Sequence, residues 1–164
     1  MIFVTVGTHE QPFDRLVKAV DGLVADGTLD EPVFVQTGYC TYEPKRCEWQ
    51  RFVPATEMRA RMEAADVVVT HGGPSSFIEA MAAGRVPVVV PRRADFGEHV
   101  NDHQTDFVRK VAERKGGIVP VFDMANLASA IEEARRITAD SAGFESHNAG
   151  FCRELELMIE RLQG

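Results

Sequence analysis

Residues 66 to 104 restrict the possible folds of this chain more than any other stretch. They begin with an apolar run, Asp66–Thr70, that leads directly into the turn His71-Gly72-Gly73-Pro74. A helix follows until Gly84, and a second apolar run, Pro87–Val90, comes next. Buried strands that alternate with helices predict a parallel sheet with crossover helices. We therefore expect an α/β fold around these two strands.

The turn after the first of these strands has the chemistry of an anion site. Its two adjacent glycines let the backbone approach a ligand closely, and Pro74 suits a first helical position, where no N–H is needed. The free N–H groups of that helical turn, together with the helix dipole, attract negative charge. Ser75 and Ser76 add hydroxyl donors suited to a diphosphate, and the sequence leaves open which of them touches it.

Glu79 lies about one helical turn further along. An ionised carboxylate is an acceptor only, so it is poorly placed to bind a phosphate but suits both hydroxyls of a ribose. The alternative is a solvated residue on the helix surface. Together with the serines, Glu79 predicts a nucleotide diphosphate that is held head-on by the helix.

The rest of the chain repeats the alternation of strand and helix. Further strands are predicted at Ile2–Val6, Val33–Gln36, Trp49–Val53 and Ile118–Phe122. Helices are predicted from Pro12 onward and over Ala55–Ala65, Asp106–Lys115 and Met124–Ile137, with a linker at Thr138–Gly143. A chain of 164 residues fits a single domain. We therefore expect one Rossmann-like, doubly wound parallel sheet within residues 1–164.

Ligands of such sheets bind at the carboxyl ends of the strands. The turn at His71 and the turn Gly7-Thr8-His9, which follows the first strand, both lie at such ends. Gly7 and Thr8 are candidates for a second wall of the site, and the alternative is an ordinary turn between a strand and a helix. His9 either approaches the ligand or caps the following helix. Met58 and Met62 have the spacing of core residues.

Composition argues against several classes of protein. The net charge of −7 argues against general nucleic-acid binding, and no apolar run reaches the ~18 residues of a membrane span. The chain starts without a basic leader, so a signal peptide is not expected. Cys40, Cys47 and Cys152 have the spacing of neither a disulfide frame nor a zinc site, which favours a reduced, cytoplasmic setting. No other cluster has metal-ligand spacing.

The central stretch resembles the C-terminal, donor-binding domain of family 28 glycosyltransferases. The shared pattern is His-Gly-Gly, two small hydroxylic residues, Glu, a helix closed by Gly, a strand ending in Pro, and an Asp/Asn–Gln cluster. The start, MIFVTVGTHEQPFDRLVKAVD, is similar to single-domain members. These are the catalytic subunit of the eukaryotic dolichol-linked UDP-GlcNAc transferase and its bacterial exopolysaccharide counterparts, and Glu-Gln-Pro-Phe at residues 10–13 resembles the bacterial branch. The resemblance implies the C-terminal half of a GT-B fold.

The resemblance also implies a set of donor-binding residues. The backbone near Val53 would lie beside uracil, Glu79 would bind the ribose, and His71 would lie beside the phosphates unless it is simply a buried or capped histidine. Asp102 and Gln104 would contact the sugar, unless their loop is plain polar surface. The implied donor-binding residues are Gly7, Thr8, Val53, His71, Gly72, Gly73, Ser75, Ser76, Glu79, Asn101, Asp102 and Gln104.

One histidine and two arginines are further candidates for the site. His9 is the candidate for catalysis, near the phosphates or the reacting sugar. Arg92 and Arg93 follow the second strand and either help to neutralise a diphosphate or form a surface pair. The family generally works without a metal, and we expect no cofactor besides the UDP-sugar donor.

The implied function is that of a donor-binding catalytic subunit of a two-component, UDP-sugar-dependent hexosyltransferase. It would add a hexose or N-acetylhexosamine to a lipid-linked saccharide in polysaccharide biosynthesis. A membrane-anchored acceptor-binding subunit would supply the general base and hold the chain at the inner face of the membrane, and the chain alone would be inactive. One alternative is a non-catalytic nucleotide-sugar-binding or stabilising subunit. Another is a nucleotide-sugar 2-epimerase. The sequence disfavours it, because that reaction needs two domains in one chain and acid/base carboxylates that we do not find.

Residues 140–164 are predicted to form a helical extension. An apolar stripe at helical spacing runs along it, formed by Phe151, Leu155, Met158, Ile159 and Leu162. The stripe either docks the partner subunit or packs back onto its own domain.

Overall fold

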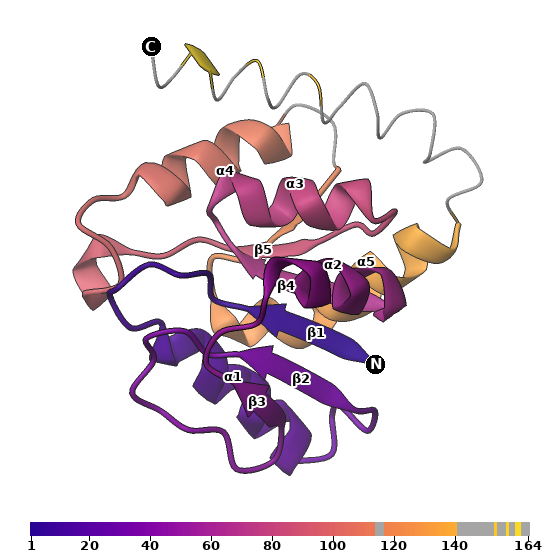
Figure 1. The fold of residues 1–164 in the computed structure, drawn as a ribbon. Coiled ribbons are helices and arrows are strands. Elements are labelled where there is room, and N and C mark those ends of the chain that lie inside the picture. Colours follow the sequence, from indigo (N-terminus) through magenta and orange to yellow (C-terminus); the bar gives the residue numbers. More distant parts are fainter. Residues whose placement is uncertain (114–116, 141–152, 154–156, 158–159, 162–164) are drawn as a thin grey trace.

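The structure is a computed structural model that describes residues 1–113 and 117–140 together with residues 153, 157, 160 and 161. In this part of the chain, six strands form one sheet in the order β3-β2-β1-β4-β5-β6 (Figure 1). The strands are β1 (Ile2–Thr5), β2 (Val33–Gln36), β3 (Glu48–Gln50), β4 (Val67–His71), β5 (Val88–Val90) and β6 (Val119–Pro120).

Helices connect the strands, as the alternation in the sequence predicts. They are α1 (Asp14–Ala25), α2 (Ala55–Ala64), α3 (Pro74–Ala82), α4 (His103–Glu113) and α5 (Leu127–Ala139), with short 3-10 helices at Ala94–Phe96 and Met124–Asn126. None of the helices in the described part of the chain is long and apolar enough to span a membrane.

All neighbouring strands are parallel, which confirms the predicted doubly wound sheet. The chain first moves outward from β1 to β2 and β3, and then returns to place β4 on the other side of β1. The direction of winding therefore reverses between β1 and β4. In open α/β sheets, ligands bind at the carboxyl ends of the strands beside such a reversal.

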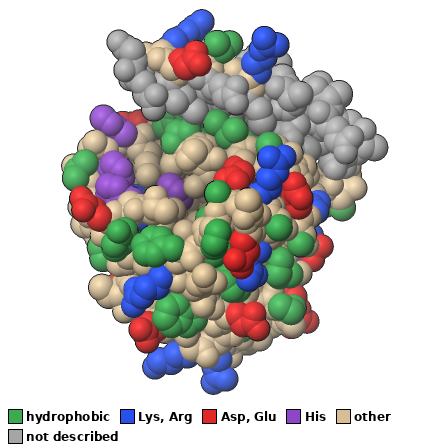
Figure 2. Space-filling view, viewed as in Figure 1, with side chains coloured by type: hydrophobic (Ala, Val, Ile, Leu, Met, Phe, Trp, Pro, Cys, Tyr) green, Lys and Arg blue, Asp and Glu red, His purple; other side chains and the backbone are tan. Residues whose placement is uncertain are grey.

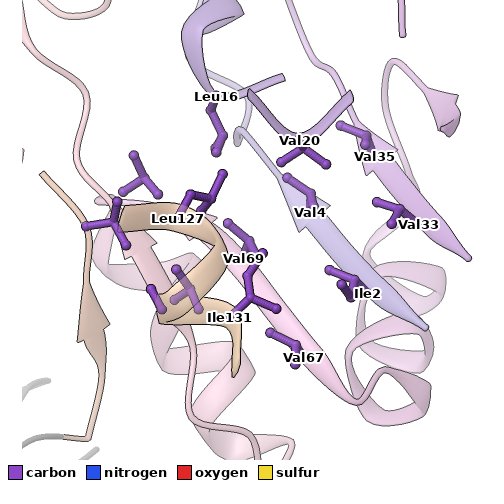
Figure 3. Packing of buried hydrophobic residues seen from close by; sticks show 14 of the residues in the cluster. Ile2, Val4, Leu16, Val20, Val33, Val35, Val67, Val69, Leu127 and Ile131 are labelled. Carbon is purple, nitrogen blue, oxygen red and sulfur yellow. The ribbon is translucent and has the colours of Figure 1, made fainter. Parts of the chain in front are cut away.

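The strands are apolar because the sheet is covered on both faces. On one face, Ile2 and Val4 of β1 and Val67 and Val69 of β4 pack against α1 and α5 (Figure 3). On the other face, Phe3 of β1 packs with residues of β4, α2 and α3. Successive side chains of a strand point to opposite faces, so the run Ile2–Val4 serves both cores.

Some boundaries differ from those predicted. Residues 51–53 leave the sheet, so β3 is shorter than the predicted Trp49–Val53. The last strand is reduced to Val119–Pro120, although the Val121 N–H still donates to the Val89 carbonyl group at 2.9 Å. The predicted linker begins inside α5, where the Thr138 hydroxyl accepts a hydrogen bond from the Val86 N–H at 3.2 Å. The apolar stripe of the C-terminal extension lies outside the described residues.

Candidate functional site

A pocket of about 550 Å³ lies at the carboxyl ends of β1, β2 and β4, where the winding of the sheet reverses. Its size falls within the ~300–1,000 Å³ usual for small-molecule sites. None of the described residues that line it is acidic. The lining residues are Thr5, Gly7, Thr8, His9, Gln36, Met58, His71, Ser75, Ser76 and Gln104.

The fold brings many of the predicted site residues together, although they are far apart in the sequence. The predicted residues in the pocket wall are Gly7, Thr8, His9, His71, Ser75, Ser76 and Gln104. The predicted residues outside the wall are Val53, Gly72, Gly73, Glu79, Asn101 and Asp102. Both candidate turns therefore border a single pocket.

Two of the residues outside the wall hold the backbone of the loop that leads to α4. The side-chain oxygen of Asn101 accepts a hydrogen bond from the His103 N–H at 3.0 Å, at the start of α4. Asp102 accepts one from the Ala94 N–H at 3.0 Å. Both side chains thus fix the path of the chain before Gln104, which does line the pocket.

Of the other residues outside the wall, Gly72 and Gly73 pack against Gln104 and His71, which line it. Val53 is buried, and Gly72 is packed so tightly that a Cβ there would lie 3.0 Å from the Cβ of Gln104. Glu79 is partly buried in α3, and its carboxylate makes no hydrogen bond or ion pair with any described residue. No described residue therefore competes with a ligand for its carboxylate oxygens.

His71 is the last residue of β4, and its imidazole lies between two glycines. A Cβ at Gly7 would lie 2.4 Å from Nε2 of the ring, and a Cβ at Gly73 would lie 2.1 Å from Cε1. Gly7 also has a φ of +78°, which disfavours other residues. Only glycine at both positions leaves room for the ring, so the two turns fit together through His71.

Hydrogen bonds fix the tautomer of His71. The Gly73 N–H donates to Nδ1 at 3.0 Å, so the proton of the neutral ring is on Nε2. Nε2 then donates to the Ser76 Oγ, 3.0 Å away. This contact occupies Ser76 as an acceptor and leaves its hydroxyl hydrogen for another partner. Of the two serines, Ser76 is therefore the one that His71 orients.

Burial is the main cause that lowers the pKa of His71 to about 3. The charges of Arg92, His9 and His99 contribute to this shift, while a hydrogen bond with Gln104 opposes it. The ring is therefore neutral at ordinary pH. In this neutral form, His71 donates a hydrogen bond to Ser76 and thereby orients it. The ring contributes no charge of its own.

His9 lies in the pocket wall and stacks on a second histidine. Its ring is 4.6 Å from that of His99, with 12° between the planes, and its Nε2 lies 2.8 Å from the Gln11 Oε1. Histidine side chains gather on the left of the view in Figure 2. His9 does not cap α1, because Phe13 is the N-cap residue and no side chain provides a capping hydrogen bond. This leaves the prediction that His9 approaches the ligand.

A family model, the glycosyltransferase family 28 C-terminal domain, matches residues 1–135. The chain belongs to this family. The resemblance predicted from the His-Gly-Gly stretch is thereby confirmed. Among curated proteins, a UDP-N-acetylglucosamine–N-acetylmuramyl-(pentapeptide) pyrophosphoryl-undecaprenol N-acetylglucosamine transferase of Bdellovibrio bacteriovorus is 30% identical over 101 residues. The match covers 62% of this chain and 27% of that protein.

Solved glycosyltransferases of the GT-B type share the fold. The glycotransferase of kitacinnamycin superposes with a TM-score of 0.56 at 21% identity, covering 95% of this chain and 39% of that one. MurG of Acinetobacter baumannii gives a TM-score of 0.54 at 17% identity, covering 93% and 49%. The predicted fold, one Rossmann-like half of a GT-B enzyme, is confirmed. The chain spans less than half the length of each of these relatives.

The prediction that Arg92 belongs to a surface pair is wrong. The side chain is fully buried and thus belongs to no surface pair. It does not line the pocket either, because its guanidinium donates to main-chain carbonyl groups of Val6, Gln11 and Glu98 at 2.6–3.1 Å. Arg93 does lie at the surface, where it pairs with Asp95 at 2.8 Å.

Three of the lining residues in this family 28 domain, Thr5, Gln36 and Met58, were not predicted as site residues. The Thr5 hydroxyl donates to the Gln36 Oε1 at 3.2 Å and accepts from the Gly7 N–H at 3.1 Å. Thr5 and Gln36 could have been found from the sequence, because each is a polar residue at the end of an apolar strand. Met58, predicted to be core, lines the pocket from the first turn of α2, whereas Met62 is fully buried as predicted.

Among the described residues, no three or more His, Cys, Asp or Glu side chains lie together in a cluster that could hold a metal ion. Cys40 and Cys47 are buried free thiols. Burial raises the pKa of Cys40 to about 11 and that of Cys47 to about 12, so neither forms a reactive thiolate at neutral pH.

Replacing Gly73 with alanine tests the packing around His71. The added Cβ would lie 2.1 Å from the ring, and Gly7 blocks movement to the other side, so we expect a loss of about 1–3 kcal/mol of unfolding free energy. Gly22→Ala is the matched control, because nothing lies within 4 Å of its Cβ position in α1, and it should stabilise by about 0.4–1 kcal/mol. Chemical denaturation measures both variants. Equal stability of Gly73→Ala and wild type would contradict the wedged position of the ring.

The low pKa of His71 predicts a pH dependence of stability. The folded protein keeps the ring neutral down to about pH 3, whereas the unfolded chain takes up a proton below a pKa of about 6.5. Because the unfolded state binds more protons in this window, lowering the pH from 7 to 5 should cost about 2 kcal/mol through this residue.

Urea denaturation at both pH values should show that wild type loses about 2 kcal/mol more than His71→Asn over this step. His103→Asn, which changes an exposed histidine, should lose as much as wild type. Equal losses in wild type and His71→Asn would show that the ring is not held neutral.

Proposed function

We propose that this chain is the donor-binding subunit of a glycosyltransferase that moves a hexose or N-acetylhexosamine from a UDP-sugar to a lipid-linked saccharide. The observation that carries the proposal is the meeting of the Gly7 turn, the His71–Ser76 pair and the start of α3 at one pocket. Membership of family 28 supports it. The named activity of the Bdellovibrio bacteriovorus relative supports the class of donor and acceptor.

In this proposal the diphosphate lies between Gly7 and the amino end of α3. The helix dipole attracts its charge, and Ser76 donates the hydroxyl hydrogen that the His71 contact leaves free. When the bond from the anomeric carbon to the diphosphate oxygen breaks, the electron pair goes to that oxygen. Donors already aimed at the developing charge then stabilise the leaving UDP. The proposal includes no cofactor.

Two polar side chains would read the rest of the donor. Glu79 lies three residues after Ser76 on α3, and its carboxylate, which no described residue binds, suits the two ribose hydroxyls. The Gln104 Oε1 accepts a hydrogen bond from the Arg92 N–H at 3.1 Å, which leaves the amide Nε2 as a donor for a sugar hydroxyl. Gln104 carries the sugar contact in this proposal, because Asn101 and Asp102 hold the backbone instead.

A second polypeptide would complete the enzyme. The described residues form one Rossmann-like unit, and the matches cover only 39% and 49% of the two GT-B relatives. The missing half would bind the acceptor, carry a membrane anchor and supply the general base that removes the proton of the acceptor hydroxyl. His9 is the candidate on this chain for a role beside the reacting sugar. The chain would then act at the inner face of the membrane through its partner.

Calorimetry with UDP tests the donor site. Glu79→Ala should weaken UDP binding by about 1.5–3 kcal/mol, the range for hydrogen bonds to a charged group. Glu113→Ala, which removes an exposed carboxylate from α4, is the matched control and should bind UDP as wild type does. If Glu79→Ala also binds UDP as wild type does, Glu79 does not hold the ribose.

A transfer assay tests the two-component arrangement. The purified chain should bind UDP without transferring sugar, and co-expression with a membrane-anchored acceptor-binding subunit should restore transfer to a lipid-linked saccharide. Turnover by the purified chain alone would contradict the need for a partner. Full transfer by the partner without this chain would instead assign the chain a non-catalytic, stabilising role.

A further inference from the structure

Arg92 is a fully buried cation without a carboxylate partner. Its guanidinium donates to the carbonyl groups of Val6 at 2.7 Å, Gln11 at 2.6 Å and Glu98 at 3.1 Å. The face of Phe13 lies 5.0 Å away, and no described residue accepts a hydrogen bond from Nε. Burying a charge without a counter-charge is costly, so this arrangement calls for a reason.

The buried carboxylate nearest to Arg92 in the sequence is already engaged. Glu98 is buried, and both of its oxygens accept hydrogen bonds from Arg15 at 3.0 Å. One of them also accepts from the Arg93 N–H at 3.0 Å. Glu98 therefore binds Arg92 only through its main-chain carbonyl group, and its negative charge acts on Arg92 without direct contact. The positive charge of Arg92 is left without a direct ion pair in the described part of the chain.

This charge lies directly behind the pocket. The guanidinium of Arg92 binds the Val6 carbonyl group, which belongs to the peptide bond between Val6 and Gly7. The main-chain N–H of Arg92 donates to the side chain of Gln104. Gly7 and Gln104 both line the pocket. The charge also acts on the pocket electrostatically, because it helps burial to lower the pKa of His71. Charges in a protein interior are screened less than charges in water.

We propose that Arg92 is a positioning residue that attracts the donor diphosphate from behind the Gly7 turn, through its buried charge and without touching the ligand. The same hydrogen bonds hold the carbonyl groups of Val6 and Gln11 and thereby fix the turn against the loop that follows β5. The bound diphosphate provides the negative charge that Arg92 lacks within the chain. The inference rests on the proposed donor site and assigns it a source of affinity for phosphate.

Comparing UDP with uridine separates this role from a structural one. Calorimetry on Arg92→Met should show a UDP-to-uridine affinity ratio about tenfold lower than that of wild type, because only UDP carries the phosphate charge. A purely structural role would weaken both ligands alike and leave the ratio unchanged. Arg93→Met removes a neighbouring surface charge that pairs with Asp95, and it should keep the wild-type ratio.

A second variant should change the UDP-to-uridine affinity ratio in the opposite direction, and it tests the role of Arg92 if Arg92→Met does not fold. Glu98→Gln keeps the shape of the side chain but removes a negative charge near Arg92, so the UDP-to-uridine ratio should rise by about threefold. An unchanged or lower ratio in Glu98→Gln would overturn the role of Arg92, as would an unchanged ratio in folded Arg92→Met. If wild type itself shows no preference for UDP over uridine, the proposed donor site is wrong, and not merely the role of Arg92.

Discussion

The pocket depends on the contact of one neutral imidazole with two glycines. His71 ends β4, yet its ring fills the space between the backbone of the first turn and the start of α3. The Gly73 N–H sets its tautomer, and the tautomer sets the direction of the Ser76 hydroxyl. A proton on Nδ1 would remove the acceptor of the Gly73 N–H and thus break this arrangement of hydrogen bonds. Burial prevents protonation, so packing determines hydrogen-bond chemistry here.

A second layer of polar contacts holds the loops around this centre. Arg92 ties the first turn to the loop after β5, and Arg15 holds Glu98 of the same loop at 3.0 Å. Asp102 fastens the loop again through Ala94. These contacts join segments that are up to 86 residues apart. The pocket is thus shaped by contacts within this chain.

The sequence was sufficient for the sheet and for the part of the site that is local in the chain. Valine runs with strand length predicted the inner strands, and the Gly-Gly-Pro-Ser-Ser turn predicted a helix that begins at Pro74. Both agree with the structure. The loop residues could not be predicted, because their direction depends on partners elsewhere. Arg92 turned inward to the Val6 carbonyl, and Asp102 turned to Ala94. Nothing in the local pattern at His99 indicated its stacking on His9.

The most direct test of the central claim is a crystal structure of the chain with UDP. The account predicts that the diphosphate lies between Gly7 and the first turn of α3, with a phosphate oxygen about 2.5–3.0 Å from the Ser76 Oγ. It also predicts that His71 keeps its contacts with Gly73 and Ser76 and that Arg92 stays buried without touching the ligand. A diphosphate that lies outside this pocket, or that points into solvent while the base alone is held, would contradict the account.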